Sequence, residues 1–525
     1  MRRLRMTMLA GSLALAAMPL QAQDRSGAGV AVTNDDAVLV LKPGFGRGPA
    51  SLLVFERAEG RWTSTERLWS EGSTRGESFG TSLALLGDGV LVASGDPGLR
   101  YGAWAFARAA SGWTAAAPLA LDRTAAAGGG PVTLATVMSI LQPPARAVAA
   151  DGDRALIATA GGEGGPAVRV FERSTEGTWR SSATLEPEGL ERNAGWGSAV
   201  ALRGARALVG APGQGRAGAV FVFERGDDGS WRQAAVLEDP DGGSDGLGSS
   251  LAFLSDDQVA VGAPRAERSR GAVAGFVRSG EGTWSRAWRL EPAGGGGVRG
   301  FGGALAARGD ELWVGAPGSD DGAGRAYGYV RPGPGSAWEA TEAFAPDDRE
   351  PRDGFGSALG LGPGVGVIGS PGSAGGAGAA FVYERVADGW SGPTRLRAAG
   401  ELEPITGAEV RCEDDAAAGY DCSEVDLLAY LPLSAIGGGP DERVSDNWGW
   451  TDPLTGREYA LIGRTGGAAI LDVTEPTDPS YRGVIPANPS GARDLKVYDD
   501  HLFFTGDGAG AHGLVVFDLT RLRDV

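Results

Sequence analysis

Short apolar runs bounded by Gly, Asp and Pro recur along most of this chain. The stretch Gly195–Trp231 (GWGSAVALRGARALVGAPGQGRAGAVFVFERGDDGSW) holds three of them, Ser198–Gly204, Ala207–Pro212 and Ala219–Arg225, and a fourth opens at Trp231. Each run has the length and the β-branched or aromatic content of a strand. Four consecutive strands form an antiparallel meander, which cannot bury both of its faces alone. The pattern therefore predicts small sheets that pack against neighbours.

Tryptophan marks the repeat of this meander. Seven tryptophans follow turn residues at spacings of 51, 66, 52, 53, 54 and 52 residues: Trp62, Trp113, Trp179, Trp231, Trp284, Trp338 and Trp390. A period near 50 built from four short strands is typical of a propeller blade. Seven such units fit a closed ring, and closure removes exposed sheet edges. The sequence predicts an all-β fold, a seven-bladed β-propeller of four-stranded blades over residues 29–400.

Two further motifs keep the same period. The pairs that open blades are Phe79-Gly80, Trp196-Gly197, Leu247-Gly248, Phe301-Gly302 and Phe355-Gly356, and GAP or GSP follows the last four at Gly210, Gly262, Gly315 and Gly369. The small residues of GAP predict close approach of the neighbouring blade, and its proline predicts the end of a strand. The repeated tryptophan is expected to pack between blades and not to serve as a ligand platform.

These motifs resemble the FG-GAP repeat, the blade of the integrin α-subunit head. The likeness is close over residues 190–396 and degenerate over 27–183, where the first and third repeats lack both motifs. The integrin calcium loop, D-x-D-x-D-G, is absent, so the resemblance is to the metal-free bacterial form and implies no calcium. The long third interval contains residues 125–146, an insertion or a displaced first strand, in which TVMSIL fits either a strand or a short helix.

The repeat dissolves near residues 399–410, which predicts a domain boundary. Two related units follow, from Glu458 and from His501, with Ile470-Leu471-Asp472 and Val516-Phe517-Asp518 46 residues apart. Residues 409–525 resemble the choice-of-anchor B family, bacterial surface proteins built on LVIVD repeats. The resemblance implies a partial second β-propeller-like domain. Because that family carries more units, we expect a fragment whose Ile470, Leu471, Val516 and Phe517 lack neighbours.

The N-terminus predicts export. Residues 1–22 combine Arg2, Arg3 and Arg5 with an apolar run and a small residue at Ala22, as in a secretory signal peptide. The alternative is an uncleaved membrane anchor, for which the run is short. The net charge of −18 becomes −21 without those three arginines, which argues against nucleic acid as a partner. We expect a secreted or cell-surface protein with no membrane span in its mature part.

Cys412 and Cys422 are the only cysteines. In an exported chain, two cysteines this close predict a disulfide that closes a small loop. The alternatives are free thiols or a metal pair, and two sulfurs without a nearby histidine make a poor zinc site.

Candidate chemistry is sparse. The only histidines are His501 and His512, so the seven repeats offer no histidine or cysteine for a triad or a thiol-ligated metal. His512, beside Asp507, fits a ligand or base, or a loop cap. We therefore predict no catalytic, cofactor-binding or metal-binding residues, and no cofactor.

Several other patterns fit both a site and a turn. Asp239, Asp241 and Asp245 resemble a calcium loop without its order or its bidentate Glu, whereas Asp320-Asp321-Gly322 and Asp347-Asp348 read as solvated turns. The glycines 294–297 precede no predicted helix, which weakens a phosphate-binding reading. Arg308-Gly309-Asp310 spells an adhesion tripeptide but falls in a turn between strands.

The combined prediction is an exported, non-enzymatic bacterial surface protein. It acts as a binding or adhesion scaffold whose loops contact an unknown protein or cell-surface ligand. One alternative is a secreted propeller enzyme that uses carboxylates at the channel mouth or in a missing C-terminal part, and another is a passive spacer. An enzyme predicts Asp, Glu or Arg converging from several blades at one end of the channel, whereas a binder predicts an aromatic or Arg-rich patch on one rim.

Overall fold

The protein was analysed as a computed structural model. It describes residues 28–524 with gaps, which are residues 43–50, 59, 69–78, 88, 95–100, 110–111, 121–144, 163–164, 244, 293–296, 334, 374–377, 388, 397–403, 413–415, 418–419, 439–443 and 512. The predicted signal peptide at 1–22, TVMSIL and His512 lie outside the described residues.

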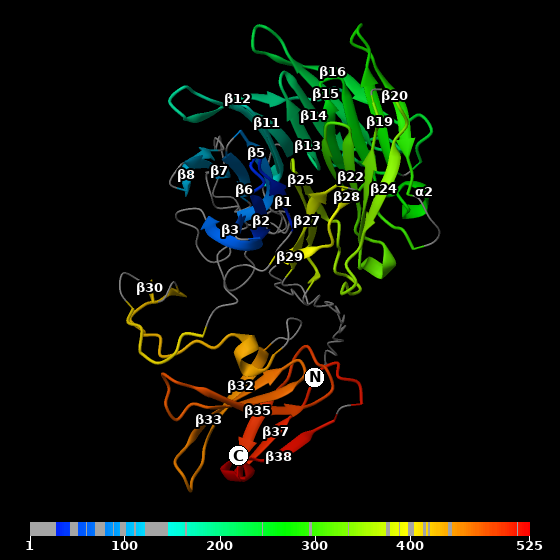
Figure 1. Ribbon diagram of the computed structural model, residues 1–525. Coiled ribbons are helices and arrows are strands. Elements are labelled where there is room, and N and C mark those ends of the chain that lie inside the picture. The colour runs from blue at the N-terminus through cyan, green and yellow to red at the C-terminus, as the bar shows by residue number, and fades with distance from the viewer. Residues whose placement is uncertain are drawn as a thin grey trace, which may run out of the picture.

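Seven antiparallel sheets follow one another along the first 400 residues (Figure 1). Blade 1 holds β1 (Val30–Val32), β2 (Val38–Lys42), β3 (Ser51–Ala58) and β4 (Arg61–Leu68), and blade 2 holds β5 (Phe79–Leu86), β6 (Gly89–Ser94), β7 (Tyr101–Ala109) and β8 (Gly112–Ala120). Blade 3 holds β9 (Ala145–Asp151), β10 (Arg154–Gly162), β11 (Gly165–Arg173) and β12 (Trp179–Leu185), and blade 4 holds β13 (Val200–Arg203), β14 (Arg206–Ala211), β15 (Ala219–Arg225) and β16 (Trp231–Leu237).

The remaining three blades repeat the plan. Blade 5 holds β17 (Ser250–Ser255), β18 (Gln258–Ala263), β19 (Ala272–Arg278) and β20 (Trp284–Leu290), and blade 6 holds β21 (Ala304–Arg308), β22 (Glu311–Ala316), β23 (Arg325–Val330) and β24 (Glu339–Phe344). Blade 7 holds β25 (Ala358–Leu361), β26 (Val365–Ser370) and β27 (Ala379–Val386), with β28 (Gly389–Trp390) and β29 (Thr394–Leu396) both on β27. The first and third repeats, which lack the sequence motifs, form complete four-stranded sheets.

The blades close into a ring. The first strands of successive blades contact one another in the cycle β1, β5, β9, β13, β17, β21, β25 and back to β1. Blades 7 and 1 share an apolar cluster in which Val30, Val38 and Phe55 pack with Val367 and Val382. The predicted seven-bladed propeller is therefore confirmed, and the ring leaves no open blade at either end.

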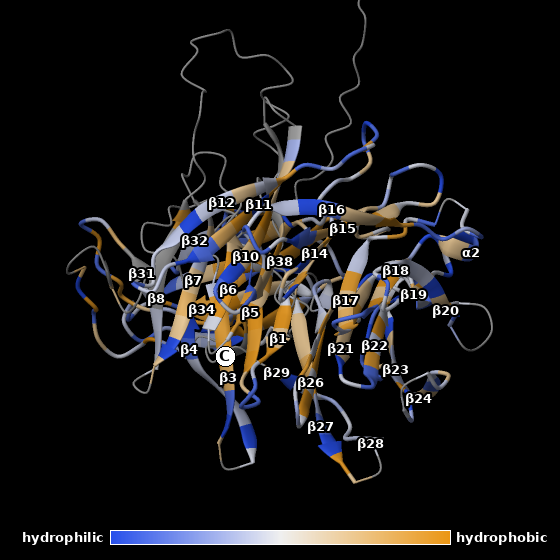
Figure 2. Ribbon diagram, turned by 90° about the horizontal axis from the view of Figure 1, so that it is seen from above, coloured by the Kyte–Doolittle hydropathy of each residue, from blue (hydrophilic) through white to orange (hydrophobic). Residues whose placement is uncertain are grey.

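The hydrophobic core of the ring lies between blades. Each of its seven buried clusters draws residues from two consecutive blades. Figure 2 shows hydrophobic colour along strands such as β1, β5 and β17 and hydrophilic colour mostly at turns. A single sheet leaves both faces apolar, so the seven interfaces provide the burial that one meander lacks.

The repeated tryptophans occupy equivalent places. A third-strand arginine pairs with a fourth-strand tryptophan in six blades, as Arg108 does with Trp113 and Arg173 with Trp179, and in blade 6 Arg331 lies over Trp338 just beyond the strand ends. Trp113 and Trp179 are buried in the clusters that join blade 2 to blade 1 and blade 3 to blade 2. The expectation that these rings pack between blades is confirmed.

Glycines of the two sequence motifs touch across the blade interface. A Cβ placed on Gly262 of blade 5 would lie 2.0 Å from the carbonyl oxygen of Gly302 in blade 6, and Gly315 has the same relation to Gly356. Gly302 itself has φ +85° and Gly356 φ +89°, a backbone region that favours glycine. GAP and FG-like pairs therefore set the closest approach of neighbouring blades, as the sequence predicts.

The C-terminal part forms two smaller sheets. Its elements are the hairpin β30 (Ala416–Ala417) and β31 (Tyr420–Asp421), the sheet of β32 (Val444–Thr451), β33 (Glu458–Arg464), β34 (Gly467–Asp472) and β35 (Ser480–Pro486), and the sheet of β36 (Leu495–Tyr498), β37 (His501–Phe504) and β38 (Val515–Asp518). The units predicted from the sequence begin at Glu458 and His501, which open β33 and β37. Each sheet has one further strand before that, β32 or β36. Trp450, Leu461, Leu495 and Phe504 join the two sheets in one buried cluster.

The expectation of missing neighbours needs correction for three of its four residues, one of which is Phe517, partly buried against the cluster between the sheets. Ile470 and Leu471 are only 4% and 6% exposed, because Ile470 enters the cluster between the sheets and Leu471 packs with Ile436. Val516 is 51% exposed, and β38 pairs with β37 alone among the described strands. β38 is thus an edge strand, as are β32, β35 and β36 among the described strands, and Val516 is the one of the four residues that stays exposed.

The described helices are short: α2 (Ala266–Ser269) and the 3₁₀ turns η1 (Asp320–Gly322), η2 (Leu433–Ile436) and η3 (Leu519–Asp524). Among the described residues, none has the length and apolar character that crossing a membrane requires. The ring and the C-terminal sheets share no buried apolar cluster in the described part of the chain, and Figure 1 draws them as two bodies.

Candidate functional site

A belt of arginines runs around one face of the propeller, where the third strand of each blade turns into the fourth. We call it the charged rim, and its members are Arg57, Arg108, Arg173, Arg225, Arg278, Arg331 and Arg385. Each lies opposite the repeated tryptophan of its own blade. The distance from the guanidinium carbon to the centre of the tryptophan ring is 5.8 Å for Arg108 and Trp113, 5.1 Å for Arg331 and Trp338, and 4.3 Å for Arg385 and Trp390. These distances permit cation–π attraction.

Strand geometry fixes where these arginines sit. The backbone N–H of Arg225, Arg278, Arg331 and Arg385 each donates a 2.8 Å hydrogen bond to the carbonyl of the residue just before the second strand. The bond closes the end of the sheet at the same point in each blade. The side chain then extends sideways toward the preceding blade.

The preceding blade supplies a carboxylate. In the simplest form it is the glutamate one residue before that blade's own rim arginine. Arg225 Nη2 lies 3.1 Å from Glu172, Arg278 Nε 3.3 Å from Glu224, and Arg57 Nη2 3.1 Å from Glu384. The last pair spans the closure between blades 7 and 1.

Arg108 reaches Glu56 of blade 1 in the same way, at 2.5 Å, and also contacts Asp35. The glutamates are partly exposed, and ion pairs of this kind each contribute about 0–1 kcal/mol. Their effect is therefore mainly to orient the guanidinium groups along the rim.

Two blades replace the glutamate by valine and move the acceptor to the adjoining strand. Val277 lies opposite Gln258, and Val330 lies opposite Glu311. Gln258 accepts a 2.7 Å hydrogen bond from Arg331, and Glu311 pairs with Arg385 and accepts 3.1 Å from Trp390 Nε1. The inter-blade contact is thus kept by a different residue in the same place.

The rim holds a cavity at the closure of the ring. About 460 Å³ in volume, it is lined by Asp35, Asp36, Glu56, Trp62 and Arg108 with Arg57, Glu384 and Arg385. Trp62 Nε1 donates a 2.9 Å hydrogen bond to Glu384 across the closure. Opposite charges alternate around this cavity, so its arginines already have acceptors.

The calcium-like turn between blades 4 and 5 binds arginine. Asp239, whose side chain is 2% exposed, contacts Arg286 and lies 2.6 Å from Arg289. Asp241 lies 2.5 Å from Arg286, and the hydrogen bond to Asp241 raises the pKa of that guanidinium. Asp245 is 4.0 Å from Arg289. Two cations of the next blade therefore occupy the place that a metal ion would take.

The other acidic turns are also held by arginines. Hydrogen bonds from Arg325 at 2.6 Å and Arg349 at 2.8 Å lower the pKa of Asp320. Asp348 is exposed and lies 3.6 Å from Arg395. Within the described part of the chain, no group of three or more His, Cys, Asp or Glu is arranged to hold a metal.

The remaining candidates do not converge on one site. Arg308-Gly309-Asp310 forms the turn between β21 and β22, as expected, and Asp310 accepts a 2.8 Å hydrogen bond from Arg331. His501 Nδ1 lies 2.6 Å from the carbonyl of Asp499 in the C-terminal part. Gly297 lies in a turn, and its carbonyl accepts a 3.0 Å hydrogen bond from the backbone N–H of Asp320. The glycines before it are outside the described residues.

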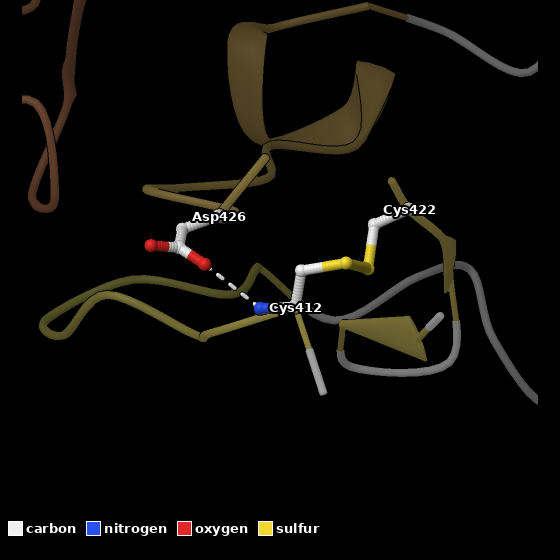
Figure 3. The surroundings of a disulfide bond; sticks show 3 residues. All are labelled: Cys412, Cys422 and Asp426. Atoms are coloured by element: carbon white, nitrogen blue, oxygen red, sulfur yellow. Dashed lines mark hydrogen bonds between the residues drawn. A yellow bond between two sulfur atoms is a disulfide. The ribbon is translucent and has the colours of Figure 1, made fainter. Parts of the chain in front are cut away.

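The disulfide is present. Cys412 and Cys422 are bonded, with their Cα atoms 5.9 Å apart. Figure 3 shows Asp426 beside the bond, where it accepts a 2.8 Å hydrogen bond from the Cys412 backbone N–H. This bond lowers the pKa of Asp426. The bridge closes the loop that precedes the two C-terminal sheets.

The sequence VFER, which begins at Val54, Val170 and Val222, lies in the third strand of blades 1, 3 and 4. The sequence predicted the strand over Ala219–Arg225 but not the contacts of its last two residues. The glutamate and arginine of VFER face opposite neighbours: in blade 4, Arg225 meets Glu172 of blade 3 and Glu224 meets Arg278 of blade 5. The signal was the repeated pairing of Glu-Arg with a following tryptophan. Only the ring shows that the glutamate of one blade meets the arginine of the next.

No protein-family model matches the sequence, and no curated protein matches it. Among solved structures, a chain of a mitotic checkpoint complex has a TM-score of 0.42 at 12% identity, covering 70% of this chain and 86% of that one. A putative 6-phosphogluconolactonase from Bacteroides fragilis has a TM-score of 0.46 at 14% identity, covering 70% and 96%. The periplasmic gluconolactonase of Pseudomonas aeruginosa has 0.46 at 15%, covering 69% and 96%. The propeller assignment itself comes from the sheet order and the closed ring.

Proposed function

We propose that this chain is an exported, non-enzymatic binding protein that contacts a protein or cell-surface ligand through its propeller rim. The observation that supports this proposal is the belt of arginines above tryptophans on one face. Arg and Trp are the residue types that dominate binding energy in protein interfaces. Arg57 and Arg385 are 53% and 41% exposed, so part of the belt is open to a partner.

The proposed location and family follow from the sequence. The signal-like residues 1–22 and the disulfide at Cys412 and Cys422 both suit an oxidising exterior. The FG-GAP-like motifs and the LVIVD-like C-terminal part are typical of surface and adhesion proteins. A propeller fold by itself does not define a function, so the rim chemistry has to be tested directly.

The test uses the mature chain, residues 23–525, carrying a fluorescent label. It is added to intact bacteria that lack the gene, and bound label is measured against concentration. We expect saturable binding that unlabelled chain displaces and that weakens as NaCl rises, because exposed charges are screened. Absent or non-saturable binding would contradict the proposal.

A variant locates the contact. The double change Arg57→Ala and Arg385→Ala is expected to weaken cell binding at least about tenfold, as hot-spot arginines do, with the melting temperature measured alongside. The matched control is Arg457→Ala in the C-terminal part, where the side chain is 50% exposed. Equal loss with both variants would place the binding surface elsewhere.

A further inference from the structure

One junction of the charged rim differs from the other six. At every other junction, the rim arginine of a blade meets an acceptor from the preceding blade: Glu384, Glu56, Glu172, Glu224, Gln258 or Glu311. Between blades 2 and 3, the third-strand position holds Ala107 and the residue opposite it is Gly89. Neither side chain can accept a hydrogen bond. The two strand positions that supply the acceptor at the other junctions therefore supply none here.

The arginine at that junction is nevertheless kept. Arg173 donates its backbone N–H to the Asp153 carbonyl at 2.8 Å, as Arg225 and Arg278 do to the matching residues of their blades. It is exposed, lies opposite Trp179, and its guanidinium has no ion pair or hydrogen bond to any residue that the structure describes. It therefore has the position of a rim arginine without the partner of one.

A cavity of about 360 Å³ fills the place of the absent side chain. Gly89, Ala107 and Arg173 line it, and Phe106 and Trp179 supply apolar and aromatic surface. Arg108 also lines it but is already paired with Glu56 and Asp35. Among the lining residues that the structure describes, the only carboxylate is Asp153.

Asp153 does not prevent a carboxylate from binding. The matching residue of blade 5, Asp257, lies 3.9 Å from Arg278, which at the same time holds Glu224 at 3.3 Å. The rim thus accommodates an arginine with both an aspartate of its own blade and a glutamate from outside it.

We propose that this cavity, the open junction, binds a glutamate side chain of a partner protein, which completes the seventh inter-blade contact. The carboxylate would accept charge-assisted hydrogen bonds from Arg173, and the methylenes would contact Phe106 and Trp179. Glutamate is chosen because it is the acceptor in five of the six complete junctions, four times from the third strand and once, as Glu311, from the second. The inference rests on the proposed binding function and assigns its contact point and ligand chemistry.

The test follows Trp179 in the mature chain labelled with 5-fluorotryptophan, its ¹⁹F signal assigned with Trp179→Phe. The probes are the blocked peptides Ac-Ala-Glu-Ala-NH₂ and Ac-Ala-Gln-Ala-NH₂. We expect the Glu peptide to shift the Trp179 signal saturably and the Gln peptide to bind at least about tenfold more weakly, because only the former gives a charged pair. Equal shifts with both peptides would overturn the proposal.

Two substitutions move the acceptor. Ala107→Glu places a glutamate where blades 1, 3, 4 and 7 have one, and it should abolish the Trp179 response while the other tryptophan signals stay in place. Glu172→Ala removes the acceptor of Arg225 and should create a new response at Trp231. An unchanged Trp179 response in Ala107→Glu, or no Trp231 response in Glu172→Ala, would show that the acceptor does not govern binding.

Cell binding separates this inference from the proposed function. If peptide binding occurs but the labelled chain does not bind cells, the proposed function fails and the carboxylate site stands. If Ala107→Glu binds cells as tightly as the wild type, the open junction is not the contact point, although the binding function stands. Loss of cell binding in Ala107→Glu, with an unchanged melting temperature, supports both.

Discussion

At the scale of single residues, arginine performs most of the organising chemistry. It joins blades on the rim, occupies the acidic turn at Asp239 through Arg286 and Arg289, and ties the C-terminal sheets together through Arg523. Its planar, permanently charged group donates up to five hydrogen bonds and suits such bidentate contacts. The acidic residues of this chain are therefore best understood together with the arginines that face them.

The pair of Asp452 and Arg523 gives a pH prediction. Asp452 is 1% exposed and accepts hydrogen bonds from Arg523 Nε at 2.9 Å and from Thr455 at 2.6 Å, and the Arg523 contact holds its pKa far below the usual range. Because the folded pKa is lower than the unfolded value of about 3.9, the contribution is complete above that pH and is lost as pH falls.

Asp452→Asn should therefore lower the melting temperature of the C-terminal part at pH 7. The difference from the wild type should shrink below about pH 4, because Asp452 of the unfolded wild-type chain then becomes protonated while the folded carboxylate stays ionised. Thermal melts of both proteins from pH 7 to pH 3 measure it. A difference that stays constant over this range would mean that the charge of Asp452 is not what stabilises the fold.

The turn at Asp239 gives a second prediction at this scale. Because Arg286 and Arg289 neutralise Asp239, EGTA should leave the melting temperature of the ring unchanged. Calcium added after EGTA serves as the control. A clear fall with EGTA that calcium restores would show that these turns hold a metal that competes with the arginines.

At the scale of the elements, the close approach of two blades depends on glycines that have no Cβ atom. Gly262 of β18 lets its backbone lie against the carbonyl of Gly302, and a Cβ there would also lie 2.1 Å from Ser250 Oγ. Because the backbones of Gly262 and Gly302 are in direct contact, there is little room for an added Cβ atom to be accommodated. The proline of GAP and the apolar strand faces determine the structure within one blade. The glycines determine how closely two neighbouring blades can pack.

Gly262→Ala should therefore destabilise the ring by about 1–3 kcal/mol, as overpacking does. Gly280, in the turn between β19 and β20, has nothing within 4 Å of its Cβ direction, so Gly280→Ala should change stability by no more than about 0.5 kcal/mol. Urea unfolding of the two variants makes the comparison. Similar losses in both would argue that glycine flexibility, and not close approach, is responsible.

The disulfide acts on the element that leads into the C-terminal sheets. Its loop has a sequence separation of 10 residues, for which the chain-entropy model gives about 3 kcal/mol. Replacing both cysteines by alanine should destabilise the C-terminal part and leave the melting of the ring unchanged. Thiol counting in denaturant confirms the oxidised state, and two free thiols in exported wild-type protein would contradict the prediction.

At the scale of the whole molecule, the propeller ring and the C-terminal part differ in how continuous their hydrophobic cores are. Seven clusters follow one another around the ring without an end, whereas the C-terminal part has two clusters and finishes with β38, an edge strand that pairs with β37 alone among the described strands and exposes Val516. An unpaired strand edge is a site of local opening and association. The ring should accordingly be the more resistant body.

Limited proteolysis of the full mature chain tests this difference. Trypsin should cut first beyond residue 396, the end of β29, and leave a resistant fragment that contains all seven blades. Mass spectrometry of the fragments locates the cuts. If residues 444–524 survive as long as the ring, the packing of their two sheets against each other is sufficient, and the expected difference in stability is wrong.

The seven blades, the place of the tryptophans and the role of the small GAP residues could be predicted from the sequence, because each depends on neighbours within about 50 residues; the tryptophan recurs in seven blades and GAP or GSP in four. The Cys412–Cys422 bond was predictable for the same reason, since its partners lie in one short segment. Only the tertiary structure decided which residues meet across blades. Glu384 accepts a hydrogen bond from Trp62 across 322 residues of chain, Asp239 faces Arg286 and Arg289, and Ile470 is buried by a sheet that begins earlier than its motif. Arg173 shows the limit most directly: its residue type and its turn are the same as in the other blades, but the adjacent blade presents Ala107 and Gly89, and its guanidinium meets no acceptor among the described residues.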